Sequence, residues 1–285
     1  MTYANPDSLV STDWLDDHLS APDVRIVDAT WYMPSTGRTG RAHYEAEHIT
    51  GAVFFDIDEV ADTNSTLPHM MPSPEKFSSR VRRLGLGNGN RIVIYDAEGM
   101  ASAATRVWWM FRYFGHKDVA ILDGGLFKWK REGRQLEDLP PIPRERHFIP
   151  RVDTTLLRDL TQMKANLQSE RDQVVDARSH GRFIGTDPEP WPVLKRGRIP
   201  GAINVPWTDL IDPETRTMLP ADALHQRFAA AGLDLERSVV NSCGSGVTAC
   251  VPAFALHLIG HSGFAVYDGS WAEWGSQSDT PAQIG

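Results

Sequence analysis

The sequence predicts an α/β protein built from two tandem copies of one unit, each a mostly parallel sheet flanked by helices. Two observations support this fold class. Short β-branched runs alternate with longer amphipathic segments, which is the pattern of strand–helix units in a parallel sheet. The chain also repeats itself once, and each copy of about 130 residues has the size of an ordinary domain.

The repeat consists of five blocks of similar residues at a nearly constant spacing. The offset is 148 residues in the first block, from Asp28 to Asp176, and 145 residues in the last, from Trp129 to Trp274. The matched segments are 24–29 with 173–178, 48–53 with 198–203, 91–96 with the run before Cys243, 114–124 with 259–269, and Trp129 with Trp274. An offset this constant indicates an internal duplication.

Individual elements follow from the apolar pattern inside each copy. The runs 92–95 and 119–122 are short and apolar, as is typical of buried strands. Segments 103–114 and 247–259 predict helices that follow strands. The aromatic side chains of the first of these helices are expected to pack in the core, namely Trp108, Trp109, Phe111 and Phe114.

A proline-rich stretch divides the two copies. We expect an N-terminal domain over 1–138, a linker over 139–153 and a C-terminal domain over 154–285, because the prolines at the start of the linker break both helix and strand. We also expect the extended chain after these prolines to wrap one domain onto the other. Alignment of the copies places Ala97 opposite Cys243. The N-terminal copy is therefore expected to be catalytically inactive.

Composition excludes several classes of function. The net charge of −8 argues against nucleic-acid binding, and no run approaches the ~18 apolar residues of a membrane span. The N-terminal residues lack the basic and apolar regions of a secretion signal. Two cysteines in a chain of this size do not form a disulfide framework, so a cytoplasmic location is expected. Nucleotide-binding glycine motifs and metal-ligand spacings are absent, so no cofactor and no metal are expected.

The loop at Cys243 carries the strongest chemical signal in the chain. Cys243 lies between an apolar strand-like run and an apolar helix-like stretch, in the sequence Cys-Gly-Ser-Gly. Flanking glycines let backbone N–H groups surround an anion, and a helix N-terminus also favours negative charge. We therefore predict that Cys243 is a nucleophilic thiolate. Cys250, expected two turns into the helix, is predicted to be a packed core thiol.

These features together resemble the two-domain rhodanese-type sulfurtransferases along nearly the whole chain. The matching segments are 176–179, 181–185, 188–190, 199–202 and the Cys243 loop in the C-terminal copy, and 51–58, 108–112 and 122–125 in the N-terminal copy. The loop form Cys-Gly-Ser-Gly-Val-Thr is similar to that of the 3-mercaptopyruvate sulfurtransferases. The resemblance implies that a Cys243 persulfide carries a sulfane sulfur from a small donor to thioredoxin, another thiol or cyanide.

The resemblance also implies roles for other residues around this loop. Ser245 would relay a proton with His69 and Asp58 of the other domain, where a carboxylate would orient the imidazole. The backbone amides of the loop would bind the persulfide and the developing charge on the donor, and they belong to Gly244, Ser245, Gly246, Val247 and Thr248.

Arg182 is the expected anchor for a substrate carboxylate, because a guanidinium binds it through two hydrogen bonds. The sequence departs from the mercaptopyruvate pattern beside it. Trp191 stands where a second arginine follows Pro-Glu-Pro, and Arg198 replaces a histidine. Lys195 or Arg196 is a candidate to supply the missing charge.

Three other functions remain open at this point. A thiosulfate:cyanide sulfurtransferase would use the same persulfide. A cysteine phosphatase would need an arginine six residues after the cysteine, where this chain has Ala249, and is disfavoured. A non-enzymatic persulfide carrier or regulatory module would keep the cysteine without turnover.

Overall fold

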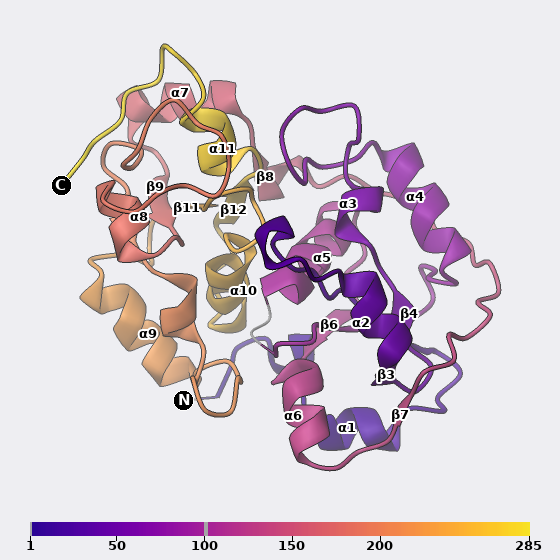
Figure 1. The fold of residues 1–285 in the computed structure, drawn as a ribbon. Helices are drawn as coiled ribbons and strands as arrows, with labels where there is room; N and C mark the ends of the chain where they lie inside the picture. The colour runs from indigo at the N-terminus through magenta and orange to yellow at the C-terminus, as the bar shows by residue number, and fades with distance from the viewer. Residues whose placement is uncertain (1, 100–101) are drawn as a thin grey trace.

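The computed structural model describes residues 2–99 and 102–285, which form two α/β domains side by side (Figure 1). The sheet of the N-terminal domain has the strand order β1-β6-β5-β2-β4, and every neighbouring pair is parallel. Its strands are β1 Leu9–Val10, β2 Val24–Asp28, β4 Val53–Phe54, β5 Arg91–Tyr95 and β6 Val119–Leu122.

The C-terminal domain repeats this topology. Its sheet has the order β8-β12-β11-β9-β10, again with parallel neighbours throughout. Its strands are β8 Leu157–Arg158, β9 Gln173–Asp176, β10 Ile203–Asn204, β11 Val239–Ser242 and β12 Phe264–Tyr267. A small antiparallel pair, β3 His48–Ile49 with β7 Leu136–Glu137, is added to the first domain. The predicted fold class of two repeated parallel sheets is confirmed.

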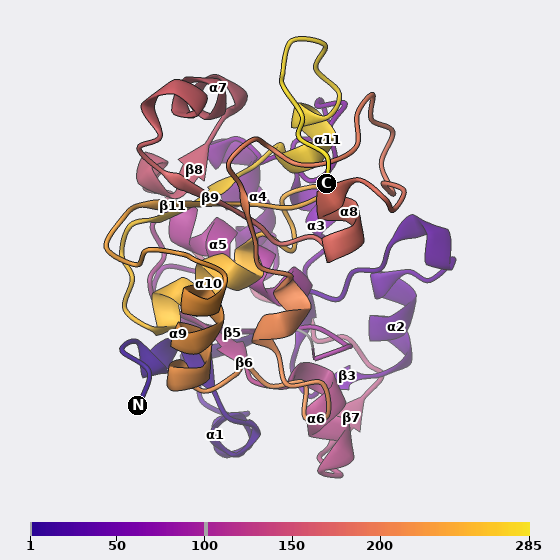
Figure 2. The same ribbon diagram turned by 90° about the vertical axis from the view of Figure 1, so that its left-hand side faces the viewer.

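Helices cover both faces of each sheet (Figures 1 and 2). Those of the N-terminal domain are α1 Thr12–Asp17, α2 Gly40–Ala46, α3 Ile57–Val60, α4 Pro74–Arg83, α5 Ser102–Tyr113 and α6 Gly125–Arg131. Those of the C-terminal domain are α7 Leu160–Ser169, α8 His180–Ile184, α9 Ala221–Ala230, α10 Cys250–Leu258 and α11 Ser270–Trp274. None of these helices is long and apolar enough to cross a membrane.

The central strands are apolar on both sides because both faces of the sheet are covered. In β5, Ile92 and Ile94 enter one core, whereas Val93 and Tyr95 enter another on the opposite face. This double burial explains why the strand is a continuous apolar run rather than an alternating one.

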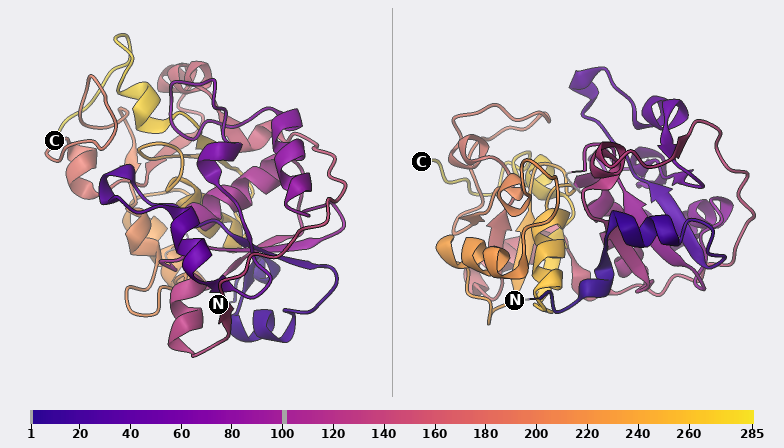
Figure 3. Two further views of the ribbon diagram at one scale, coloured as in Figure 1. Left: turned by 45° about the vertical axis from the view of Figure 1, so that its right-hand side comes forward. Right: turned by 90° about the horizontal axis from the view of Figure 1, so that it is seen from below.

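The two domains meet along α5 and α10, which pack against each other (Figure 3). The Trp108 ring of α5 lies edge-on to Phe254 of α10, with ring centroids 4.9 Å apart. One apolar core is continuous across this boundary. The predicted core aromatic residues of α5 and the turn after it are all fully buried, which confirms that expectation.

Helix α10 begins later than the sequence pattern predicts. The apolar pattern predicts a start at residue 247, but the chain forms a loop over 243–249 and α10 starts at Cys250. Gly246 has φ +77, a left-handed conformation that interrupts a right-handed helix. Cys250 is therefore the first residue of α10, and not two turns inside it as expected.

The chain between β7 and Thr154 contains no helix or strand and lies along the N-terminal domain. Phe148 in this stretch is 2% exposed, and its ring packs against Phe77 and Phe111 at centroid distances of 5.6 and 6.1 Å. The Ser78 hydroxyl donates to the Phe148 carbonyl at 2.8 Å. The connection is therefore anchored to the first domain before it enters the second.

Replacement of Phe148 by alanine is expected to lower the free energy of unfolding by about 3–5 kcal/mol, the usual cost of removing a buried aromatic ring. Urea denaturation measures this change. Ile149→Ala is the matched control, because the Ile149 side chain is 53% exposed and its loss is expected to cost under about 0.5 kcal/mol. Equal losses in the two variants would show that Phe148 does not anchor the connection.

Candidate active site

The loop that carries Cys243 joins β11 to α10 at the carboxyl edge of the sheet. The Cys243 side chain is 1% exposed, and its backbone N–H donates to the Ser270 hydroxyl at 3.1 Å. The same hydroxyl lies 3.9 Å from Cys243 Sγ. The start of α11 also holds the loop, since the Trp271 N–H donates to the Cys243 carbonyl at 3.0 Å. Hydrogen bonds thus fix the Cys243 backbone on both sides, and the Ser270 hydroxyl also reaches the buried sulfur.

The two glycines of the loop lie close to neighbouring groups, and Gly246 is needed for steric reasons. A Cβ atom on Gly246 would stand 2.4 Å from the Asp268 carbonyl oxygen, and one on Gly244 would stand 2.6 Å from Arg182 Nη2. The contact with the Asp268 backbone is not tolerated, whereas a side chain at Gly244 would displace the Arg182 guanidinium from the loop. The glycines therefore let the loop approach β12 on one side and the Arg182 guanidinium on the other.

Three polar side chains form a chain of hydrogen bonds across the domain boundary. His69 Nδ1 lies 3.2 Å from Ser245 Oγ, and His69 Nε2 lies 3.0 Å from Asp58 Oδ1. A carboxylate accepts hydrogen bonds, so in the neutral imidazole the Asp58 contact favours the proton on Nε2 and leaves Nδ1 as an acceptor. The Ser245 hydroxyl can then donate to His69. The structure thus brings together the three residues for which a proton relay was expected.

Asp58, the acid in this series of hydrogen bonds, is held in its charged form. Burial acts to raise the pKa of Asp58, but hydrogen bonding and charge from His69, together with the Trp31 N–H, hold the pKa below its usual value. Trp31 Nε1 donates to Asp58 Oδ2 at 2.8 Å. Asp58 is therefore ionised at neutral pH and orients the His69 ring.

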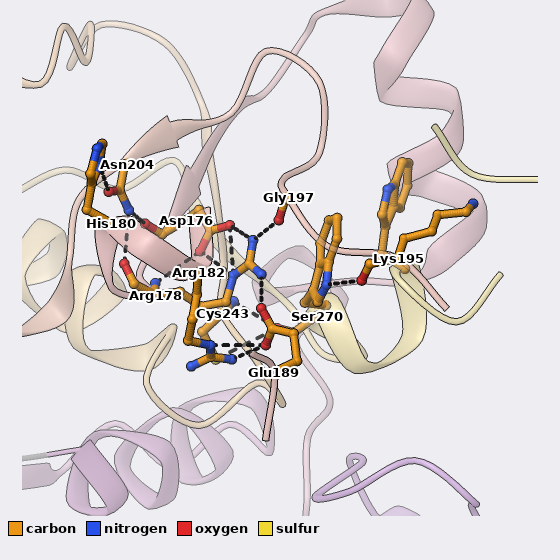
Figure 4. A network of polar contacts seen from close by, with 12 residues as sticks. Asp176, Arg178, His180, Arg182, Glu189, Lys195, Gly197, Asn204, Cys243 and Ser270 are labelled. Carbon is orange, nitrogen blue, oxygen red and sulfur yellow. Dashed lines mark hydrogen bonds and ion pairs between the residues drawn. The ribbon is translucent and has the colours of Figure 1, made fainter. Parts of the chain in front are cut away.

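Two arginines of the C-terminal domain share one buried glutamate (Figure 4). Glu189 accepts from Arg178 Nη1 at 2.6 Å and from Arg182 Nε at 3.0 Å. Arg178 is paired in turn with Asp176. The Arg182 atom nearest Gly244 is Nη2, which also donates to Glu189, whereas Nη1 has no hydrogen bond to any described residue and lies 3.7 Å from the Cβ position of Gly244. Arg182 is therefore placed to bind an anion next to the cysteine loop.

The other two expected cations are placed differently. The Lys195 ammonium donates to the Gln277 carbonyl at 2.6 Å and to the Thr280 carbonyl, and Figure 4 shows it turned away from Glu189. This placement corrects the expectation for Lys195, because an ammonium bound to the C-terminal segment does not replace the missing arginine. Arg196 is exposed, with no hydrogen bond or ion pair to the described part of the chain.

Two indole rings meet His69 from opposite domains. The Trp31 ring lies edge-on at a centroid distance of 4.9 Å, and the Trp191 ring at 5.6 Å. Trp191 is half-buried. The residue that replaces the expected arginine thus contacts the imidazole of the relay. The sequence alone assigns no role to Trp31 or to Glu189, although Glu189 lies in the Pro-Glu-Pro motif.

Cys250, the first residue of α10, lies next to the loop and is fully buried. Its thiol donates to the Gly246 carbonyl at 3.4 Å, and burial raises the pKa of this thiol well above its usual value. A neutral, buried thiol matches the expected core role. Within residues 2–99 and 102–285, no group of three or more His, Cys, Asp or Glu residues is placed to hold a metal ion.

Comparison with known proteins gives consistent results for both halves. The Rhodanese-like domain family matches residues 11–132 and 159–277. The chain is 43% identical to human 3-mercaptopyruvate sulfurtransferase over 94% of its length and 91% of that protein. It is 39% identical to mitochondrial thiosulfate/3-mercaptopyruvate sulfurtransferase 1 of Arabidopsis thaliana, covering 99% of this chain and 79% of that one. The crystal structure of SseA from Escherichia coli, a 3-mercaptopyruvate sulfotransferase, superposes with a TM-score of 0.85 at 37% identity, covering 93% and 98% of the two chains.

Proposed function

The chain belongs to the rhodanese family of sulfurtransferases, and on that premise we propose that it transfers a sulfane sulfur from 3-mercaptopyruvate through a persulfide on Cys243. The observation that carries this proposal is the hydrogen bond between Ser245 and His69, two residues from the cysteine and across the domain boundary. It supplies a path for a proton beside a buried sulfur.

The reaction has two half-reactions. The Cys243 thiolate attacks the thiol sulfur of 3-mercaptopyruvate, a sulfur–sulfur bond forms, and the carbon–sulfur bond breaks. The electron pair of that bond leaves on carbon as the enolate of pyruvate, which takes up a proton. Ser245 and His69 move this proton between the donor thiol and the product. An acceptor thiolate or cyanide then attacks the outer sulfur, and the Cys243 thiolate leaves.

Arg182 determines the preference for the donor in this proposal. Its free Nη1 can bind the single carboxylate of 3-mercaptopyruvate beside the loop. Thiosulfate carries two charges, and Gly244, Ser245 and Gly246 offer it only amides and one hydroxyl. Arg182 is already paired with Glu189, so its attraction for a further anion is reduced. We therefore propose a preference for 3-mercaptopyruvate with an elevated KM.

A comparison of kcat/KM for the two donors tests this preference, and 3-mercaptopyruvate is expected to be the better one. Arg182→Ala is expected to raise its KM roughly tenfold to a hundredfold, the effect of losing a charged hydrogen bond of about 1.5–3 kcal/mol. Trp191→Arg is expected to lower KM. Arg227→Ala, an exposed arginine of α9, is the control and should leave KM unchanged. A higher kcat/KM for thiosulfate would instead favour a thiosulfate:cyanide sulfurtransferase.

We also propose a class of acceptor and a location in the cell. The candidate acceptors of the persulfide sulfur are thioredoxin, small thiols and cyanide, since each presents a nucleophile to the outer sulfur. We place the enzyme in the cytoplasm because both cysteines are free thiols, which is typical of a reducing compartment. Turnover with a purified acceptor would exclude a purely non-enzymatic carrier.

A further inference from the structure

A fully buried arginine on α5 contacts both halves of the candidate site. The Arg106 side chain is 1% exposed, and Nη1 donates to the Gly246 carbonyl at 3.1 Å. Its other terminal nitrogen, Nη2, donates to the His69 carbonyl. One guanidinium thus joins the loop of the nucleophile to the residue that carries the imidazole of the relay.

The partner of Arg106 holds the same two segments. Asp268 follows the last residue of β12, is itself buried, and its Oδ1 lies 2.8 Å from Arg106 Nη1. Its Oδ2 accepts from the Met71 N–H at 2.7 Å. The segment around His69 is therefore held at two points, by Arg106 at the His69 carbonyl and by Asp268 at the Met71 amide. An ion pair that served only to stabilise the core would not need these contacts with the backbone of both segments.

The two carbonyls that Arg106 binds belong to residues in unusual conformations. His69 has φ +59 and Gly246 has φ +77. A left-handed conformation at a residue other than glycine persists only where its surroundings fix it. The Arg106 bond fixes the peptide plane that follows His69, and with it the backbone from which the imidazole extends toward Asp58 and Ser245. On the other side it fixes the peptide plane that follows Gly246, the residue after Ser245.

We propose that Arg106 is a positioning residue that sets the hydrogen bond between His69 and Ser245, by holding the His69 and Gly246 carbonyls at a fixed separation across the domain boundary. The inference rests on the proposed role of this hydrogen bond in sulfur transfer. Arg106 makes no hydrogen bond to Cys243 within the described residues, so it acts through the relay and not on the sulfur.

Arg106→Lys tests whether the positions of the two donor nitrogens matter, or only the positive charge. A lysine keeps the positive charge beside Asp268, but its single nitrogen cannot occupy both terminal positions of the guanidinium. We expect kcat with 3-mercaptopyruvate to fall tenfold or more, while KM stays within about twofold. The control is Arg112→Lys, the same change on the same helix, at a residue without a hydrogen bond to the described chain. It should keep the wild-type rate.

A double-mutant cycle shows whether Arg106 acts through His69. If it does, Arg106→Lys costs nothing further in a His69→Ala background. A loss by the same factor in both backgrounds, or a wild-type kcat in Arg106→Lys, would overturn the inference. Should the lysine variant fail to fold, the pair Arg106→Met with Asp268→Asn removes both buried charges and enters the same cycle.

A second measurement does not depend on the donor. The imidazole nitrogen resonances of His69 report whether Nδ1 accepts a hydrogen bond. The Nδ1 signal is expected to shift in Arg106→Lys and to stay at its wild-type position in Arg112→Lys. An unchanged signal in Arg106→Lys overturns the inference. If the wild-type enzyme does not turn over 3-mercaptopyruvate but the signal responds, the proposed function fails and the positioning role stands.

Discussion

Cys243→Ser is expected to reduce sulfur transfer to less than about a thousandth of the wild-type rate, the scale of losing a catalytic nucleophile. A serine hydroxyl is a poor nucleophile and cannot form a persulfide. Intact mass after donor treatment is the direct measurement. The wild-type protein should gain about 32 Da, the mass of one sulfur atom on Cys243, and the variant should gain nothing.

Cys250→Ala is the matched control for this experiment. Its thiol is neutral and buried below the loop, so the variant should still gain the mass of one sulfur. Sulfur found on Cys250, or full turnover by Cys243→Ser, would contradict the assignment of the nucleophile.

His69→Ala is expected to lower kcat with 3-mercaptopyruvate about a hundredfold, at the lower end of the range for general acid–base catalysis. The reason is that Ser245 loses the acceptor of its hydroxyl proton. Discharge of a preformed persulfide by cyanide requires no proton, so its rate should stay near that of the wild type. Rapid mixing of donor-treated enzyme with cyanide separates the two half-reactions.

His225→Ala on α9 is the control histidine and should behave as wild type in both half-reactions. Equal losses of donor and acceptor rates in His69→Ala would mean that the ring supports the loop rather than moving a proton. Undiminished turnover with 3-mercaptopyruvate would remove His69 from the mechanism.

The fold could be predicted because the chain contains two versions of the same pattern. A strand assigned in one copy, such as 119–122, is supported by its counterpart in the other. The two-residue edge strands β1 and β8 could not be found, because two residues carry no periodicity. The sequence pattern starts α10 too early because apolar residues after Gly246 fit a helix, whereas the loop is shaped by its contact with Asp268, the residue after β12.

The candidate site could be predicted only in part, and sequence distance explains the difference. The Cys243 loop is local, so its residues can be read together. Asp58 and His69 were associated with it only through the resemblance to a family. Arg106 was missed because its partner Gly246 lies 140 residues away. Lys195 was misplaced because residue type gives a charge but not the direction of the side chain.

The contact between α5 and α10 joins the same helix of each copy, as in the interface of a symmetric dimer. A dimer of identical subunits would carry the cysteine and the histidine in both halves. Two halves on one chain are free to diverge, and Ala97 stands in the first copy at the position that Cys243 occupies in the second. Because the halves are covalently tethered, their effective concentration does not fall on dilution. A site composed from both domains therefore stays assembled at any protein concentration, unlike one formed between dissociable subunits.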